Sequence, residues 1–264
     1  MKVIKIDKNK WDQGIEALKG SYNLFSPVKQ KDDFEFKKLE KDEKPDLTGS
    51  NTRLSAKGLI YPQSQAMFTY TLDENDENHH ILKPVEKENA LRAVIGIRPC
   101  DADAFLLVKR NFDTPEYKDP YWIEAYEKTT FAGIACNKPC STCFCTSAGS
   151  GPFCEGGLDV LISEKEGGFL LKPVTEKGEA LVKAAGWDKG FDADEKEITA
   201  LKEKAEAKIL SSVKTDNLKN KASMDIYNAP FWEDVSFACI NCGTCTFVCP
   251  TCWCFDIQMC RCRS

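Results

Sequence analysis

Near its end the chain contains the stretch Ser236-Phe-Ala-Cys-Ile-Asn-Cys-Gly-Thr-Cys-Thr-Phe-Val-Cys-Pro-Thr-Cys-Trp-Cys-Phe255. Four of its cysteines follow the spacing C-x2-C-x2-C-x3-C, and a proline closes the run: Cys239, Cys242, Cys245, Cys249 and Pro250. The two-residue gaps allow a tight turn to direct successive sulfur atoms toward one metal centre. Gly243 gives the backbone the freedom to bend there. The stretch therefore predicts a site in which thiolates bind metal.

This spacing favours iron and sulfide over zinc. Bacterial ferredoxins bind [4Fe–4S] clusters with the same three closely spaced cysteines and a fourth cysteine before proline. Zinc sites also use C-x2-C pairs, but they usually combine two separated pairs. We therefore expect Cys239, Cys242, Cys245 and Cys249 to be cluster ligands. A zinc-stabilised structural or assembly protein is the alternative.

The composition is that of a soluble globular protein. The chain has 264 residues, of which 42% are hydrophobic and 29% charged, and its formal net charge is -5. A mildly acidic balance disfavours binding to nucleic acid or to anionic membranes. No apolar run is long enough to span a bilayer, and the first residues lack the apolar core of a secretory signal. We therefore expect a cytoplasmic protein.

The cysteines are clustered. The chain has fourteen, at position 100 and within 136–154 and 239–262. Clustered cysteines in a chain without a secretory leader favour metal binding over disulfides. Clusters of this kind suit an anaerobe.

Short apolar runs predict an α+β fold in which the first domain contains a mixed sheet. Residues 3–6 predict a strand, and a helix should follow with Trp11, Ile15 and Leu18 on one face. Phe34 and Phe36 alternate with charges, which indicates an edge strand or hairpin arm. Residues 61–72 predict further strands, and the chain's two histidines follow in the polar loop 73–80. Residues 158–162 and 169–171 predict a hairpin, and the charged stretch 175–222 predicts helix.

Two buried strands should each deliver a cysteine at the carboxyl end. Residues 93–97 lead to Cys100, and residues 131–135 lead to Cys136. After Cys100 we expect a helix capped by Asp101 or Asp103, with Ala104, Leu107 and Val108 on one face. If the strands are neighbours, one edge of the sheet holds both cysteines and forms a metal site.

A second group of cysteines lies in this region. Its spacings are x3, x2 and x1, through Cys136, Cys140, Cys143 and Cys145. A four-iron cluster needs four thiolates, and one of them can be remote in sequence, so Cys100 is a natural donor. Gly149 and Gly151 would let backbone amides approach the sulfides, and Arg98 would offset the cluster's negative charge or form a structural ion pair. Cysteines that simply pack in a core are the alternative.

Three motifs occur in order: Gly96-Ile-Arg-Pro-Cys-Asp101, the stretch 136–152 with its Thr-Cys-Phe-Cys-Thr-Ser core, and the cysteine run ending at Cys-Phe-Asp256. In this combination the chain resembles the iron–sulfur β subunits of hydrogenase/sulfur reductase complexes, the sulfhydrogenase β family, to which anaerobic sulfite reductase A is similar. The resemblance implies that Cys100, Cys136, Cys143 and Cys145 bind one [4Fe–4S] cluster. Cys140, often glycine in relatives, and Cys154 are then spare. It also implies a partner subunit that contains flavin, with further subunits that carry the catalytic metal.

The chain departs from the family after Asp256. Relatives continue to a second cysteine run, whereas this sequence ends at Ser264. In two-cluster ferredoxins the fourth cysteine of each run binds the other cluster, so Cys249 would belong to a cluster completed by sequence not present here. The other possibility is that Cys260 and Cys262 supply the missing ligands. We favour a missing portion.

The predicted organisation is a domain at 1–226 with one cluster, followed at 227–264 by part of a helical, loop-rich ferredoxin-like module with at least one more. The predicted function is electron transfer between a flavin site and a catalytic metal site in a multi-subunit oxidoreductase of the hydrogenase type. The sulfite reductase setting is an alternative. No motif for substrate chemistry is present, so we expect a non-catalytic subunit.

Overall fold

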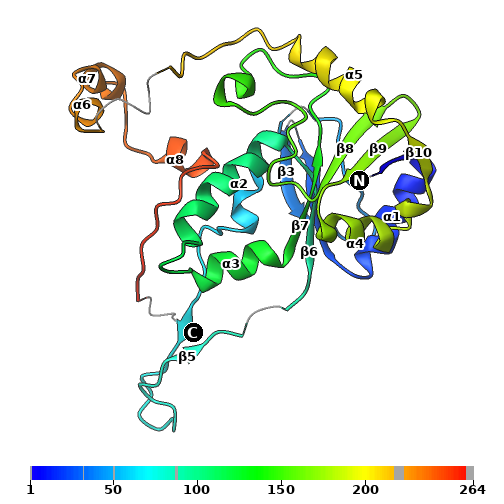
Figure 1. The fold of residues 1–264 in the computed structure, drawn as a ribbon. Helices are drawn as coiled ribbons and strands as arrows, with labels where there is room; N and C mark the ends of the chain where they lie inside the picture. The colour runs from blue at the N-terminus through cyan, green and yellow to red at the C-terminus, as the bar shows by residue number, and fades with distance from the viewer. Residues whose placement is uncertain (1, 32, 50, 87–88, 217–222, 260–264) are drawn as a thin grey trace.

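The computed structural model describes residues 2–31, 33–49, 51–86, 89–216 and 223–259. In chain order (Figure 1) the elements are β1 (Val3–Asp7), α1 (Lys8–Lys19), β2 (Asn23–Gln30), β3 (Asp33–Lys38), η1 (Ala56–Leu59), β4 (Phe68–Thr69), β5 (Lys83–Pro84), β6 (Arg92–Ile97), α2 (Pro99–Phe112), α3 (Pro120–Glu127), β7 (Thr129–Ile134), η2 (Cys145–Ala148), β8 (Val160–Lys165), β9 (Gly168–Pro173), α4 (Glu176–Ala184), η3 (Trp187–Lys189), β10 (Phe191–Ala193), α5 (Glu195–Glu206), α6 (Ser223–Tyr227), α7 (Phe231–Ser236) and α8 (Thr244–Val248).

An eight-stranded mixed sheet forms the centre of the fold, in the order β10-β1-β9-β8-β7-β6-β2-β3. The neighbours β8, β7, β6 and β2 run parallel. The flanking strands pair antiparallel: β9, β1 and β10 on one side and β3 on the other. The predicted α+β class with a mixed sheet is confirmed, as are the hairpin β8–β9 and the edge strand β3.

Helices cover both faces of the sheet. Figure 1 shows α2 and α3 on one face and α1 and α4 on the other. Successive side chains of a strand point to opposite faces, so in β7 Phe131 joins the core under α2, while Ala132 and Ile134 join the core under α1 and α4. A parallel strand covered on both faces is apolar throughout. This is why β6 and β7 were visible in the sequence as continuous apolar runs.

Helix α1 forms as predicted. The Asp7 carboxylate caps it by accepting from the Lys10 amide at 2.7 Å. Trp11, Ile15 and Leu18 are buried on its inner face. The Trp187 ring stacks on Trp11 with centroids 4.8 Å apart. Aromatic pairs of this kind stabilise a core beyond the area they bury.

The helix after Cys100 begins earlier than predicted. Arg98 is its N-cap residue and Pro99 its first helical residue, so Asp101 lies inside the first turn and neither Asp101 nor Asp103 is the cap. Proline is favoured at this position because its missing N–H would have had no partner in the helix. Ala104 and Val108 are buried as expected. Leu107 is 48% exposed, and that part of the prediction was wrong.

Two other predictions need correction. In the region 61–72 the only named strand is the two-residue β4, which pairs with β5 in a separate small sheet. The charged stretch predicted as helix contains α4 and α5, but β10 lies between them and pairs with β1. β10 is a three-residue edge strand in which Phe191 is 79% exposed, so it lacks the apolar alternation that marks a strand in a sequence.

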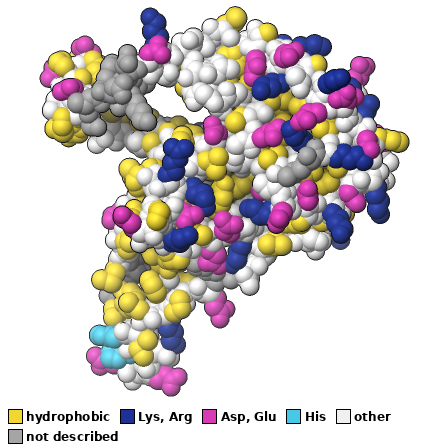
Figure 2. Space-filling model, viewed as in Figure 1, with side chains coloured by type: hydrophobic (Ala, Val, Ile, Leu, Met, Phe, Trp, Pro, Cys, Tyr) yellow, Lys and Arg dark blue, Asp and Glu magenta, His cyan; other side chains and the backbone are white. Residues whose placement is uncertain are grey.

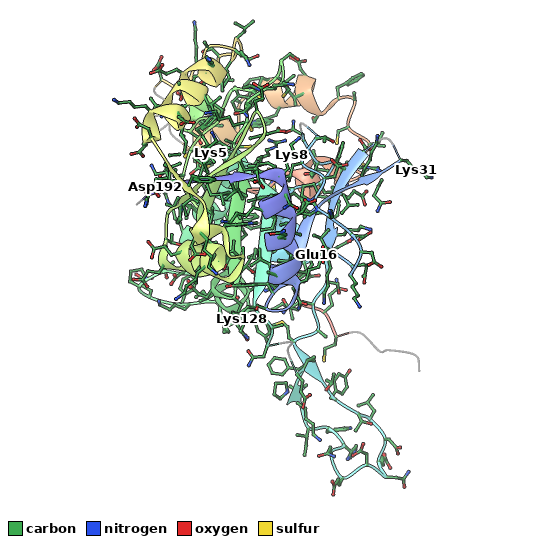
Figure 3. All side chains as sticks on the ribbon, turned by 90° about the vertical axis from the view of Figure 1, so that its right-hand side faces the viewer. Lys5, Lys8, Glu16, Lys31, Lys128 and Asp192 are labelled. Atoms are coloured by element: carbon green, nitrogen blue, oxygen red, sulfur yellow. The ribbon has the colours of Figure 1, made fainter. Side chains whose placement is uncertain are left out.

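The described residues after α5 are not part of the hydrophobic core. None of the described residues beyond Ala205 is buried, and the segment 223–259 consists of α6, α7, α8 and irregular chain. Figure 2 shows hydrophobic side chains at the surface of this segment and of the β4–β5 arm, and Figure 3 shows that arm projecting away from the body. Over the described ranges, no helix has both the length and the apolar character needed to cross a membrane.

Candidate functional site

The carboxyl ends of β6 and β7 position the first two cysteines. These strands are parallel neighbours, and their ends therefore meet at one edge of the sheet. Cys100 follows β6 as the second residue of α2, and Cys136 follows β7 after a single intervening residue. In open α/β sheets, ligands bind outside the carboxyl ends of parallel strands. The topology thus places both cysteines where a prosthetic group could be held.

The Cys100 sulfur lies in a crowded setting although the residue reaches the surface. Desolvation by the surrounding protein raises the pKa of its thiol to about 12, with smaller contributions from the negative charges of Asp101, Cys136 and Cys145. Desolvation also raises the pKa of Asp101 to about 6, against the opposing effect of Arg98. Thiolates in such a setting require a positive charge nearby, and a metal centre supplies one.

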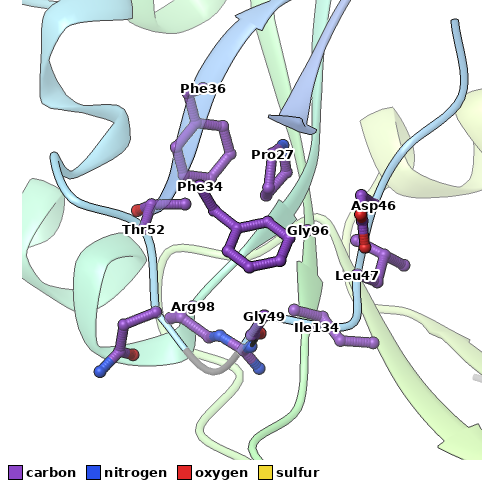
Figure 4. Close-up of a pocket in the computed structure, with 11 residues that line it drawn as sticks. Pro27, Phe34, Phe36, Asp46, Leu47, Gly49, Thr52, Gly96, Arg98 and Ile134 are labelled. Atoms are coloured by element: carbon purple, nitrogen blue, oxygen red, sulfur yellow. Dashed lines mark hydrogen bonds between the residues drawn. The ribbon is translucent and has the colours of Figure 1, made fainter. Parts of the chain in front are cut away.

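Arg98 contacts Cys136. Its guanidinium donates to the Cys136 sulfur at 3.8 Å and, through the other terminal nitrogen, to the Gly49 carbonyl. Figure 4 shows the Arg98 side chain beside Gly49, in a pocket that Phe34 and Ile134 help to line. Burial raises the pKa of the Cys136 thiol, while the charge of Arg98 and its hydrogen bond lower it. Among the roles proposed for Arg98, these contacts fit charge compensation at a thiolate.

The remaining cysteines of this group lie in the loop between β7 and β8. Cys143 and Cys140 have their sulfur atoms 3.0 Å apart, and the Cys140 amide donates to the Cys143 sulfur at 3.2 Å. Desolvation raises the pKa of Cys143 to about 11, whereas hydrogen bonds from Thr142 and then Cys143 lower the pKa of Cys140 to about 7. Desolvation also raises the pKa of Cys145.

Besides desolvation, the negative charges of Cys136 and Cys145 help to raise the pKa of Cys100, and the charge of Cys136 helps to raise the pKa of Cys143. Within the described ranges, no three Cys, His, Asp or Glu side chains are arranged to hold a single metal ion. A mononuclear zinc site needs four ligand atoms around one point.

Of the two predicted glycines, Gly149 has a local structural role. It has φ +76°, and its amide donates to the Thr146 carbonyl at 3.3 Å, ending η2. A residue with a side chain would be strained there. At Gly151 an added Cβ would meet only the flexible end of the Glu206 side chain, at 3.3 Å. That either amide approaches a sulfide stays a prediction.

The C-terminal cysteines are spread along an exposed segment. Cys239 and Cys242 lie between α7 and α8, and Cys245 lies in α8. Gly243 has φ +71° and begins α8, which confirms the expected bend. Backbone and hydroxyl groups lie against the sulfurs: the Asn241 amide donates to Cys239 at 3.4 Å, and Thr244 lies 3.2 Å from Cys242. Donors of this kind accompany thiolates that bind iron–sulfur clusters.

Two residues in and just after η1 tether this segment. The Lys57 ammonium donates to the backbone carbonyls of Cys249 at 2.8 Å, Cys252 at 3.3 Å and Thr246 at 3.4 Å. The Tyr61 hydroxyl donates to the Trp253 carbonyl at 2.9 Å. The end of the cysteine run is therefore attached to η1 and the residues just after it, beside α2.

Comparison with known proteins places the chain in a functional context. It is 25% identical over 263 residues to the sulfhydrogenase 2 subunit beta of Pyrococcus furiosus, an alignment that spans 97% of this chain and 74% of that protein. The chain is thus similar to a sulfhydrogenase β subunit. The resemblance predicted from the three cysteine motifs is thereby confirmed. No family model matches the chain, and no solved structure matches it.

Sequence reasoning did not find Lys57 or Tyr61, because lone residues in a loop give no local signal of a contact more than 190 positions away. It also did not find Asn51, whose amide lies 3.9 Å from the Cys140 sulfur. The possible tail ligands Cys260 and Cys262 fall outside the described residues. The two histidines lie at the end of the projecting β4–β5 arm, with their rings 4.0 Å apart (Figure 2).

Proposed function

We propose that this chain is an electron-transfer subunit of a multi-subunit oxidoreductase of the hydrogenase/sulfur-reductase type. The observation that carries the proposal is the meeting of Cys100 and Cys136 at the ends of two neighbouring parallel strands. The second cysteine run is docked on the same domain through Lys57. The similarity to a protein named as a sulfhydrogenase subunit supports the oxidoreductase setting and the presence of partner subunits.

At the first site the ligands would be Cys100, Cys136, Cys143 and Cys145. A [4Fe–4S] cluster held there would accept and release single electrons. The chain's own contribution is to hold the thiolates and to balance their charge. Arg98 donates to the Cys136 sulfur, and the backbone of Cys140 donates to the Cys143 sulfur. Hydrogen bonds and positive charge at cluster sulfurs raise the reduction potential.

At the second site the ligands would be Cys239, Cys242, Cys245 and Cys249, for at least one further [4Fe–4S] cluster. If Cys249 serves a neighbouring cluster, as in two-cluster ferredoxins, that cluster would need further ligands. We assign this run to a ferredoxin-like module at 227–264, distinct from a domain at 1–226. The loss of buried residues after Ala205 supports such a division.

The chain would relay electrons between a partner subunit that contains flavin and a subunit with the catalytic metal, in the cytoplasm of an anaerobe. It would have no substrate chemistry of its own. Its acidic composition does not favour nucleic acid as a partner.

The test is reduction of the anaerobically purified chain with dithionite, followed by visible and EPR spectroscopy. Broad visible absorption should bleach on reduction, and signals of reduced [4Fe–4S] clusters should appear. The matched control is Cys154→Ser, which removes a thiol outside the proposed ligand sets and should leave both signals in place. A colourless protein that shows no redox response would exclude the electron-transfer function.

A further inference from the structure

The turn after β7 contains two cysteines in a Cys-x-x-Cys arrangement. Cys140 and Cys143 are separated by Ser141 and Thr142, and the Cys143 amide closes the turn by donating to the Cys140 carbonyl at 3.1 Å. Their sulfur atoms are 3.0 Å apart. A disulfide bond is roughly 2 Å long, so a small side-chain movement would join them. In a protein of reducing compartments, a Cys-x-x-Cys turn that follows a strand of a βαβ unit is typical of a redox-active pair.

The surroundings of Cys140 suit the attacking sulfur. The Thr142 hydroxyl lies 3.4 Å from it, and the Asn51 amide donates to it at 3.9 Å from a loop far away in sequence. The Cys140 amide donates to the Cys143 sulfur at 3.2 Å, which holds the two sulfurs on the same side of the turn. With Cys140 as the attacking sulfur, Cys143 is the resolving thiol.

The short sulfur–sulfur distance also means that Cys140 and Cys143 cannot both bind the proposed cluster in this arrangement. Each thiolate of a four-iron cluster binds a different iron, so two sulfurs in contact with each other cannot both be ligands without moving apart. The resemblance to the sulfhydrogenase β family assigns Cys143 as the ligand and leaves Cys140 outside the ligand set. We propose that Cys140 and Cys143 form a reversible disulfide, and that its formation withdraws Cys143 from the cluster site. The disulfide itself depends only on the pair. Its effect on the cluster rests on the proposed function.

The oxidant would be a low-molecular-weight disulfide, R–S–S–R. The Cys140 thiolate attacks one sulfur, so a bond forms between Cys140 and that sulfur, the R–S–S–R bond breaks, and one RS⁻ leaves. Cys143 loses its proton to water and attacks the Cys140 sulfur, which expels the second RS⁻. The two cysteine sulfurs are oxidised by two electrons in total, and the external disulfide is reduced to two thiols. An excess of a dithiol reduces the Cys140–Cys143 disulfide to two thiols through the same kind of exchange, and the dithiol is itself oxidised to a disulfide.

The test uses the full chain, with oxidised glutathione as the probe. The chain is freed of iron with a chelator under reducing conditions, desalted without oxygen, exposed to the probe and alkylated. The Cys140–Cys143 disulfide should be the main product in mass spectra of the peptide 129–165, and dithiothreitol should remove it. Cys154→Ser should give the same product, whereas Cys140→Ser should not. The inference would be overturned if Cys140 were alkylated, if it stayed joined to glutathione, or if it paired with another cysteine.

A second measurement separates this inference from the proposed function. In the iron-loaded chain, oxidised glutathione should release iron in step with formation of the disulfide, and Cys140→Ser should lose that coupled release. If the protein forms the disulfide but never binds iron, the disulfide inference is upheld and the proposed function fails. If the protein binds iron but oxidised glutathione forms no Cys140–Cys143 disulfide, with iron or without it, the disulfide inference fails and the proposed function stands.

Discussion

Replacement of Lys57 by methionine should release the end of the cysteine run from the first domain. The lysine side chain is half-buried and donates to the carbonyls of Cys249 at 2.8 Å, Cys252 at 3.3 Å and Thr246 at 3.4 Å. Methionine keeps most of the aliphatic length but removes the charge and every donor. The variant therefore isolates these hydrogen bonds from the packing of the side chain.

The magnitude follows from the geometry. A hydrogen bond to a charged group contributes about 1.5–3 kcal/mol, and only the 2.8 Å bond to Cys249 has a near-ideal length. With a small addition from the two longer bonds, the loss should be about 2–3 kcal/mol. Since each 1.4 kcal/mol is tenfold, the docking equilibrium should shift by roughly 30- to 150-fold.

The assay is native-state hydrogen exchange of the backbone amides in residues 246–253. Local opening governs the exchange of hydrogen-bonded amides, so the Phe247 and Cys252 amides, which donate to the Gly243 and Cys249 carbonyls, should exchange faster by up to the factor above. The matched control is Lys208→Met, because Lys208 donates to the Asn137 carbonyl at 3.1 Å and does not contact this segment. Exchange rates in residues 246–253 that are the same in Lys57→Met, Lys208→Met and the unchanged chain would refute the reasoning.

Three further predictions concern the first domain. Cys100→Ser should abolish one reduced-cluster EPR signal and keep the signal of the C-terminal run; an unchanged spectrum would exclude Cys100 as a ligand. Arg98→Met should lower the reduction potential of the first cluster in a potentiometric titration, since it removes a positive charge that contacts Cys136; an equal or higher potential would contradict this. Asp159→Ala should lower the free energy of unfolding in urea by about 3 kcal/mol. The reason is that the buried Asp159 carboxylate accepts from the Phe131 amide at 2.8 Å and from the Thr175 hydroxyl. A loss below about 1 kcal/mol would show that these hydrogen bonds contribute little to stability.

The sequence predicted the centre of the sheet well because local pattern and burial agree there. In β6 and β7 almost every residue is buried, so their apolar runs stand out. Strand β2 was missed because it contains Pro27 and polar residues, which argue against a central strand. The structure accommodates the proline, since the pairing of β2 with β6 ends at Phe25 and Pro27 pairs only with β3.

The cysteine motifs predicted which sulfurs to examine but not their surroundings. Spacing along the chain indicated the C-terminal run and the group from Cys136 to Cys145. The contact between Cys140 and Cys143 depends on how the loop folds, and the approach of Asn51 depends on packing between segments 89 residues apart. Such contacts arise from tertiary structure, and a single sequence contains no periodic or spacing signal for them.

The central claim is that the cysteines of this chain bind iron–sulfur clusters. Metal and acid-labile sulfide analysis of the anaerobically purified full chain tests it most directly. We predict iron and sulfide in equal molar amounts and no stoichiometric zinc. Stoichiometric zinc without labile sulfide would contradict the account, because the same thiolates would then serve a redox-silent structural site.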